Sequence, residues 1–352
     1  MTNSTAFDFH LNRPGALIAA IPAVLGFVPE HSLVLVTLTG SEMGAVIRAD
    51  LSDDMADMSD GLEQLTEVAA SGSADAAVAV IVDQEGLDCL MCSEEHRALG
   101  TTLMTILRHQ GIALLAVYVV DRVAAGGRWQ CADDCGNHGT IDDPGSSPLA
   151  LAAVLDGRRL YTRRADLLGV VAVAEPARVD AIGRAIDKRS GPSDEPRADG
   201  EVRSDIDLVM GVAGRLAHGV PPQDDELAAM ACAVVDPRVR DTLYALAVGV
   251  RSAEAEDLWA LMARTLPPPW RIEALVLLAF SAYARGDGPL AGVALETALD
   301  VDGSHRMAVM LDTALQTGMR PDRIRELALT GYRLAAQLGV QLPPRREFGR
   351  SA

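Results

Sequence analysis

Two apolar runs, Ala76-Ala-Val-Ala-Val-Ile-Val82 and Ile112-Ala-Leu-Leu-Ala-Val-Tyr-Val-Val120, flank a segment with helical periodicity that extends from Glu94 to His109. Short apolar runs without charged residues are typical of strands that are buried on both faces. Buried strands that alternate with helices indicate a covered, mixed sheet of the α/β type. The sequence therefore predicts an α/β fold class around these two strands.

The segments before and after these strands extend the same pattern. Ala16 to Leu25 predicts a short apolar helix that ends at Gly26, and Ser52 with the acids that follow it is typical of a helix N-terminus. Further strands are expected at 32–38, 43–51 and 128–132, and further helices at 148–156, 164–173 and 176–188.

The second half of the chain has a different character. The stretch from Lys188 to Gly200 is rich in Pro, Gly, Ser and charge and has no apolar periodicity, which predicts a linker at 189–203. No strand is expected after Asp205, and eight helical segments with short connections indicate an all-α helical-hairpin domain. The predicted division is an α/β domain at 1–188, the linker, a helical domain at 204–340 and a frayed tail at 341–352.

Composition limits the partners and the chemistry. The chain has 352 residues, and its 31 basic and 49 acidic residues give a net charge of −18, which disfavours binding to nucleic acid. Lys188 is the only lysine and stands at the start of the linker-like stretch, which excludes a P-loop lysine and a Schiff-base lysine. The longest apolar run, Ala16 to Val28, is too short for a membrane span. We expect a cytoplasmic protein with no membrane contact.

Familiar catalytic motifs are missing from the sequence. The patterns Gly-x-Ser-x-Gly, Gly-x-Gly-x-x-Gly, Gly-x-x-x-x-Gly-Lys and His-Glu-x-x-His do not occur. Their absence disfavours an α/β hydrolase, a dinucleotide-dependent enzyme, an NTPase and a zinc protease of the common kind. It leaves open an enzyme with an unfamiliar site.

Cysteines form the most distinctive group of reactive residues. Cys89 and Cys92 make a Cys-x-x-Cys pair, and Cys131, Cys135 and His138 add two thiols and an imidazole. Zinc takes four such ligands in a tetrahedron, so two pairs are able to bind it. The alternatives are a redox-active pair and plain packing, since buried cysteines behave as small apolar residues. We expect no cofactor, and zinc is the alternative.

A charged pair on an expected strand suggests a ligand pocket. Arg48 and Asp50 share one face of the strand, opposite Ile47, Ala49 and Leu51. Together with Trp129 they are candidate ligand-binding residues at the edge of the sheet. The alternative is a structural salt bridge or an exposed strand face.

The helical half contains one segment with repeat character, between Leu275 and Asp302. Its small and large residues have tetratricopeptide spacing, with Gly286-Asp287 at the turn, although Gly303 stands where that repeat usually has proline. An ordinary helical hairpin is the alternative. Large aromatic residues dominate binding interfaces, so four aromatics of this half are candidates for contact with a partner: Tyr244, Trp259, Trp270 and Tyr283. The alternative for each is core filling.

Four segments resemble an actinobacterial family that is described only as a domain of unknown function. They are Arg13 to Val34, Arg48-Ala-Asp-Leu51, Arg128 to Cys135 and Val239-Arg-Asp-Thr-Leu243. The resemblance covers most of the chain and implies the same two-part architecture, but it implies no activity. The stretch from Gly86 to Cys92 does not share it, and Cys135 is followed by Gly where the family typically has Cys-Pro.

Two functional hypotheses follow from these features. The first is a non-enzymatic interaction or regulatory protein whose helical half binds a protein partner or a second copy of itself. Because the chain is acidic, a basic partner segment is expected. The second is a ligand-binding or catalytic α/β domain with its site near Arg48, Asp50 and the Cys131–Cys135 segment.

Overall fold

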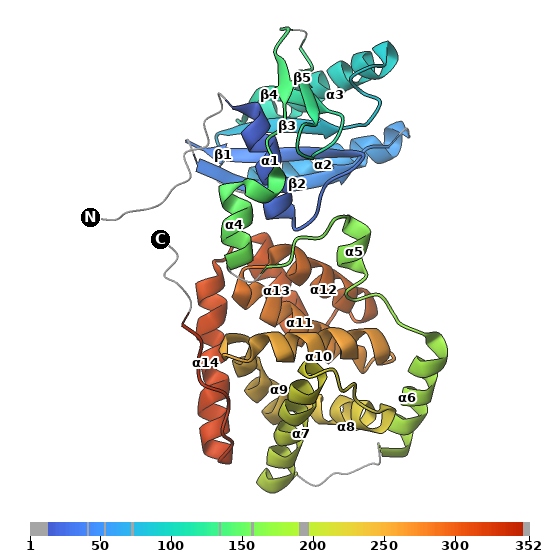
Figure 1. The fold of residues 1–352 in the computed structure, drawn as a ribbon, viewed down its shortest axis with the longest axis vertical. Helices are drawn as coiled ribbons and strands as arrows, with labels where there is room; N and C mark the ends of the chain where they lie inside the picture. The colour runs from blue at the N-terminus through green and yellow to red at the C-terminus, as the bar shows by residue number, and fades with distance from the viewer. Residues whose placement is uncertain are drawn as a thin grey trace, which may run out of the picture. The chain divides into compact units, whose positions relative to one another are not determined.

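The structure is a computed structural model, and it describes residues 13–40, 42–52, 54–71, 74–133, 135–155, 158–189 and 197–347. Two compact units divide the chain, with the boundary between Arg164 and Ala165. The first unit contains a six-stranded mixed sheet with helices, and the second is helical, as the sequence predicted (Figure 1). The strands are β1 (Ser32–Thr39), β2 (Glu42–Asp50), β3 (Ala76–Val82), β4 (Ala113–Val120), β5 (Arg128–Cys131) and β6 (His138–Thr140).

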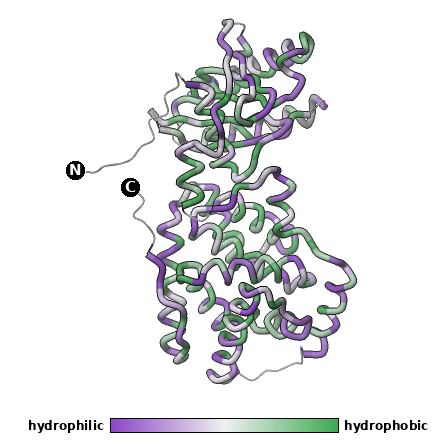
Figure 2. Tube along the Cα trace, in the orientation of Figure 1, coloured by the Kyte–Doolittle hydropathy of each residue, from purple (hydrophilic) through white to green (hydrophobic). Residues whose placement is uncertain are grey.

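The sheet has the order β2-β1-β3-β4-β5-β6. Only β3 and β4 pair in parallel, and α3 (Leu90–His109) connects them; every other neighbouring pair is antiparallel. The uncharged sequence of β3 is explained by its central position, because its residues from Ala77 to Val82 are buried. The apolar tube segments in Figure 2 follow these central strands.

Helices cover both faces of this sheet. Leu33 and Leu35 of β1 and Ala79 and Ile81 of β3 pack against α2 (Met55–Ser71) and α3, which contribute residues such as Leu65 and Leu103. The opposite face carries α1 (Pro14–Leu25), which begins with proline and ends at Gly26 in the left-handed conformation (Figure 1). A short helix η1 (Pro144–Ser146) and α4 (Pro148–Leu155) complete this unit and contact α1.

The second unit is a set of packed helices. They are α5 (Arg164–Leu168), which begins at the boundary, α6 (Pro176–Arg189), α7 (Asp199–Ala217), α8 (Asp224–Val234), α9 (Pro237–Leu243), η2 (Tyr244–Val248), α10 (Ser252–Thr265), α11 (Arg271–Arg285), α12 (Gly288–Val301), α13 (Arg306–Gln316) and α14 (Pro321–Leu338). The central helix is α11, of which the residues from Ala274 to Ala284 are all buried. It forms a hairpin with α12 through Gly286 (φ 89°) and Asp287, which caps α12; its tetratricopeptide character stays a prediction.

Three boundaries differ from those expected. The unit boundary lies before α5 instead of after Lys188, because α6 packs against α8 within the helical unit. Residues 190–196 of the predicted linker lie outside the described residues, and its last part belongs to α7, since the Glu201 carboxylate caps the amide of Ala198. The tail is not frayed at its beginning. Val250 donates a backbone hydrogen bond to Pro344, and Arg346 donates one to Val248.

The packing of α14 generates a stability prediction. A Cβ atom on Gly331 would lie 2.7 Å from the carbonyl oxygen of Thr242 and 3.0 Å from the amide nitrogen of Ala245. Because backbone atoms cannot move aside cheaply, Gly331→Ala should lower the free energy of unfolding by about 1–3 kcal/mol. Gly200→Ala is the control, since no atom lies within 4 Å of its Cβ position. It should be neutral or stabilising by up to about 1 kcal/mol. Urea denaturation of both variants measures the difference, and equal stabilities would contradict the prediction.

Candidate functional site

A cavity of about 1410 Å³ opens at one edge of the sheet, within the α/β unit. We call it the sheet-edge cavity. The carboxyl ends of β3 and β4 reach this edge, and the residues before β1 lie there too because β1 is antiparallel to β3. Its wall includes Val82, Asp121 and His31 from these strand ends and Ser59 and Cys92 from the first turns of α2 and α3. Crevices outside the carboxyl ends of strands are the usual ligand sites of α/β sheets.

Two aspartates mark the ends of the parallel strands. Asp83 follows β3, and its amide donates a hydrogen bond of 2.9 Å to the carbonyl oxygen of Val120 at the end of β4. Asp121 follows β4, and its Oδ1 accepts hydrogen bonds of 2.7 Å from the backbone amides of Arg122 and Arg128. The strand pairing therefore holds both carboxylates at the cavity wall.

His96 of α3 contacts the first of these aspartates. Its Nε2 lies 3.1 Å from Oδ2 of Asp83, and its side chain is only 8% exposed. Gly86 allows this approach, because a Cβ atom there would lie 2.6 Å from Cε1 of the imidazole. The other ring nitrogen, Nδ1, is buried and has no hydrogen-bond partner among the described residues. A buried polar atom without a partner costs about 1–3 kcal/mol, so such atoms are few in folded proteins.

The protonation state of His96 follows from its surroundings. Burial lowers the pKa of the imidazole, and the attraction of Asp83 opposes this shift without reversing it. A neutral imidazole has one N–H, and the Asp83 carboxylate can only accept a hydrogen bond. The N–H is therefore on Nε2, and Nδ1 carries a lone pair. Because Nδ1 is itself buried, the contact of His96 that bears on the cavity is the one by which Nε2 holds the Asp83 carboxylate at the wall.

Acidic side chains outnumber basic ones around the cavity. Its only arginines, Arg122 and Arg128, both contact Asp121 at 3.3 Å, and Arg128 also bonds to Asp88 at 2.8 Å. Three further carboxylates line the wall, those of Glu30, Glu85 and Glu95. No other arginine or lysine among the described residues lines the cavity to neutralise them. The arrangement favours a cationic group, and apolar residues such as Leu62 and Leu99 offer it an apolar floor.

The predicted ligand-binding residues lie elsewhere. Arg48 and Asp50 do share a face of β2 and bond to each other, and the Arg48 Nε donates to the Ser32 hydroxyl at 2.8 Å. The Arg48 guanidinium also lies over the ring of Phe27. Trp129 is buried and packs edge-on against Tyr118, with ring centroids 5.2 Å apart. None of the three predicted residues lines the sheet-edge cavity.

The cysteines separate into two places. Within the described part of the chain, the one group with ligand atoms close enough to hold a metal ion is Cys131, Asp133 and Cys135 in the turn between β5 and β6. His138 is not in this group; its Nδ1 contacts the carbonyl oxygen of Gly136 at 3.0 Å. Cys89 and Cys92 lie at the start of α3 and are also outside it. The four thiols therefore do not form a single cluster.

Three of the four aromatic partner-binding candidates are core residues. Tyr244, Trp259 and Tyr283 are at most 5% exposed, and Tyr244 packs on Phe280 with ring centroids 4.5 Å apart. Trp270, just before α11, is half-buried. The alanines of α10, α11 and α12 let these helices approach closely, and the large rings fill the remaining space.

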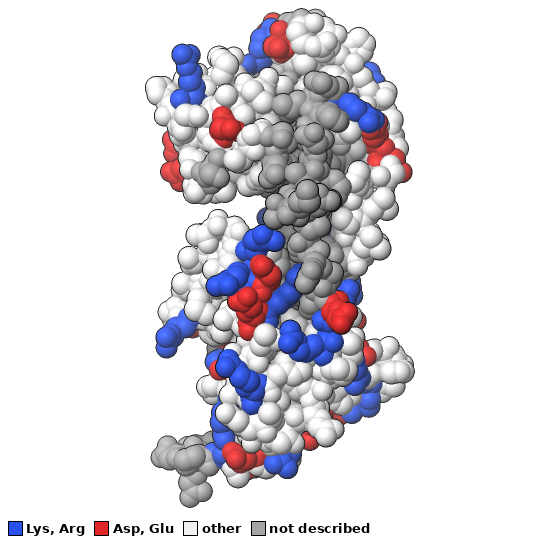
Figure 3. Space-filling model, turned by 90° about the vertical axis from the view of Figure 1, so that its left-hand side faces the viewer, with Lys and Arg blue, Asp and Glu red and all other residues white. Residues whose placement is uncertain are grey.

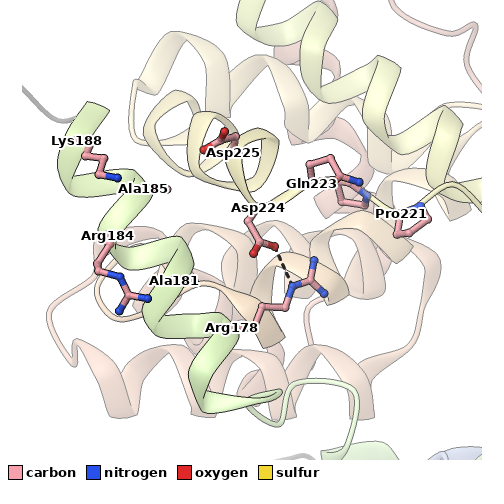
Figure 4. Close-up of a pocket in the computed structure, with 10 residues that line it drawn as sticks. Arg178, Ala181, Arg184, Ala185, Lys188, Pro221, Gln223, Asp224 and Asp225 are labelled. Atoms are coloured by element: carbon pink, nitrogen blue, oxygen red, sulfur yellow. Dashed lines mark hydrogen bonds and ion pairs between the residues drawn. The ribbon is translucent and has the colours of Figure 1, made fainter.

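A second pocket, of about 640 Å³, lies within the helical unit and is shown in Figure 4. Lys188 lines it from the last turn of α6, so the lysine is not in a linker. Arg178 also lines it and bonds to Asp224 at 3.0 Å. The pocket contains no buried polar atom that lacks a partner among the described residues. We therefore regard the sheet-edge cavity as the better candidate.

Apart from Cys92, which was named as a candidate metal ligand, the residues of that cavity were missed from sequence, although signals existed. Asp83 and Asp121 each come directly after a predicted buried strand, and Cys92 and His96 are four apart, on one face of a helix. Only the parallel pairing of β3 with β4 shows that these signals converge.

Fold and site together define a two-unit protein with a ligand-sized cavity in its α/β unit. A family model described as "Domain of unknown function (DUF4192)" matches residues 14–322, and the chain belongs to this family. No curated protein and no solved structure matched the chain. No helix in the described ranges is both long and apolar enough to cross a bilayer. Family membership confirms the resemblance that the sequence indicated. That the family is actinobacterial stays a prediction.

The state of His96 generates a pH prediction. Unfolding exposes the imidazole, whose pKa then returns to about 6.5, above its lowered value in the folded chain. Between these two values the unfolded chain binds more protons, so the contribution of His96 to stability should be lost as the pH falls below about 6.5. His96→Gln should show a smaller loss of unfolding free energy between about pH 7.5 and pH 5.5. His109→Gln, exposed at the end of the same helix, should keep the wild-type slope in urea denaturation.

Proposed function

We propose that the α/β unit binds a small organic ligand that carries a cationic group and an apolar portion. The observation that carries this proposal is the excess of carboxylates over arginines on the wall of the sheet-edge cavity, beside apolar residues such as Leu62 and Leu99. Of the two hypotheses drawn from the sequence, we therefore favour the second, a ligand-binding or catalytic α/β domain. Its site, however, is the sheet-edge cavity and not the surroundings of Arg48 and Asp50.

The carboxylates select the type of ligand. Glu85 and Glu95 lie between Asp83 and His96 in the sequence, next to one or the other, and Glu30 reaches the cavity from the segment before β1. A guanidinium or ammonium group would neutralise this wall, whereas a phosphate or carboxylate would be repelled by it. A cavity of about 1410 Å³ is large enough to hold a small organic molecule.

Binding can be tested with agmatine, which carries a guanidinium and an ammonium group on an apolar chain. Agmatine should raise the Tm of the full chain, while inorganic phosphate should not. His96→Gln should weaken binding about tenfold, on the order of 1.4 kcal/mol, because the contact that orients the Asp83 carboxylate at the cavity wall is lost. His109→Gln is the matched control on the same helix. Isothermal titration calorimetry on the three proteins gives the affinities.

Two results would reject this proposal. One is stabilisation by phosphate in place of agmatine. The other is equal agmatine affinity in the wild type, His96→Gln and Glu95→Gln. Gly86→Ala provides an independent check, because its methyl group would displace the imidazole without removing it. It should weaken binding as well.

Protein binding by the helical unit is a second candidate function, and we infer it from the surface of α13. Val309 and Met310 of this helix are exposed, Met310 by 54%. These two side chains offer an apolar contact, and the charges on the face of the helical part that Figure 3 shows are interspersed, with no single-sign patch. The occupant would be a protein partner or a second copy of the chain, bound beside the tetratricopeptide-like hairpin.

Self-association is the form of this candidate that can be tested directly. Sedimentation equilibrium of the full chain should detect a dimer, and Met310→Lys should shift it to monomer by placing a charge in the contact. Ser204→Lys, at an exposed position of α7, is the control and should leave the association unchanged. A wild-type chain that stays monomeric at high concentration would argue against a self-association surface.

A further inference from the structure

The Cys-x-x-Cys segment has the local geometry of a dithiol. Cys89 is the N-cap of α3, and its sulfur accepts a hydrogen bond from the amide of Cys92, with Sγ and N 3.4 Å apart. The thiol of Cys92 also donates to the Cys89 sulfur. The turn therefore holds the two sulfurs against each other at the start of a helix that follows a buried strand. Cys-x-x-Cys in a strand–helix–strand context is a recognised signature of redox-active dithiols.

The two thiols are not equivalent. The hydrogen bonds from the thiol and the amide of Cys92 lower the pKa of Cys89, and the position at a helix N-terminus favours a thiolate further. The same thiol–thiol hydrogen bond raises the pKa of Cys92 to about 11, with burial and the negative charge of Asp83 contributing. Cys89 is thus suited to attack a disulfide, and Cys92 is suited to resolve the mixed disulfide that forms.

A reacting molecule has access to this pair. Both cysteines are partly exposed, and the two residues between them, Leu90 and Met91, are 88% and 70% exposed. Exposed apolar side chains beside a thiol provide a contact surface for the apolar part of a substrate. In contrast, burial is the main reason that the pKa of Cys131 rises to about 12, which makes that thiol a poor nucleophile.

We propose that Cys89 and Cys92 form a redox-active dithiol that exchanges with disulfides of small molecules or peptides. The Cys89 thiolate attacks one sulfur of the disulfide RS–SR, whose S–S bond breaks, and RS⁻ leaves and takes a proton from water. Cys92 then loses its proton to solvent and attacks the Cys89 sulfur of the mixed disulfide, which releases the second RS⁻. The substrate gains two electrons, and the pair becomes the Cys89–Cys92 disulfide.

The test uses the full chain and glutathione disulfide as the oxidant. The reduced wild type should form an internal Cys89–Cys92 disulfide, located by alkylation, digestion and mass spectrometry of the peptides. Cys92→Ser should instead accumulate a mixed disulfide with glutathione on Cys89, because the resolving thiol is missing. Cys89→Ser should react at least about tenfold more slowly at Cys92. Cys232→Ser, on α8, is the matched control and should behave as the wild type.

The pH dependence adds a readout that a purely structural pair would not show. In Cys92→Ser, the serine hydroxyl can still donate to the Cys89 sulfur, so the rate of mixed-disulfide formation should reach half its maximum below about pH 8.5, the ordinary pKa of a thiol. Circular dichroism confirms that each variant is folded. Failure of the wild type to form the internal disulfide, or equal rates in Cys89→Ser and Cys92→Ser, would overturn the proposal.

Discussion

The parallel hydrogen bonding between β3 and β4 is the constraint on which the α/β unit depends. It brings the carboxyl ends of two strands to one edge, so that the amide of Asp83 bonds to Val120 and Asp121 lies on the neighbouring strand end. It also requires a crossover, and the chain supplies α3. Because α3 starts at that same edge, its first turns carry Cys92 and His96 to the wall of the cavity, with Cys89 just before them at the N-cap. One pairing therefore positions both groups of reactive residues.

Much of this fold could be predicted from sequence because its strands are short, apolar and bounded by turns. The apolar runs from 76 to 82 and from 112 to 120 correspond to β3 and β4, with one residue of difference at the start of β4. The strand from His138 to Thr140 was missed, since three residues with a histidine and a glycine give no periodic signal. The start of α7 was placed too late, because the capping contact of Glu201 with Ala198 lies in a segment of linker-like composition.

The cavity could not be predicted in the same way. Arg48 and Asp50 were correctly placed on one face of a strand, but a local pattern does not show which sheet edge is hollow. The approach of His96 to Asp83 depends on the contact of α3 with β4 and on the missing side chain of Gly86. Aromatic residues presented a related difficulty. From sequence alone, Trp259 and Tyr283 could be either surface or core residues. Only the burial of α10 and α11 shows that both are core residues.

Lys188 offers a single side chain for selective chemical labelling. It is the only lysine of the chain, it lies in the last turn of α6, and it lines the cavity drawn in Figure 4. Apart from the α-amino group, a reagent that acylates amines therefore has a single target. A fluorescent dye attached there would label one helix of the helical unit without mutagenesis. Such a dye would lie in the same unit as Trp259 and Trp270, two of the three tryptophans, which makes energy transfer between them a direct optical measure of whether that unit is folded.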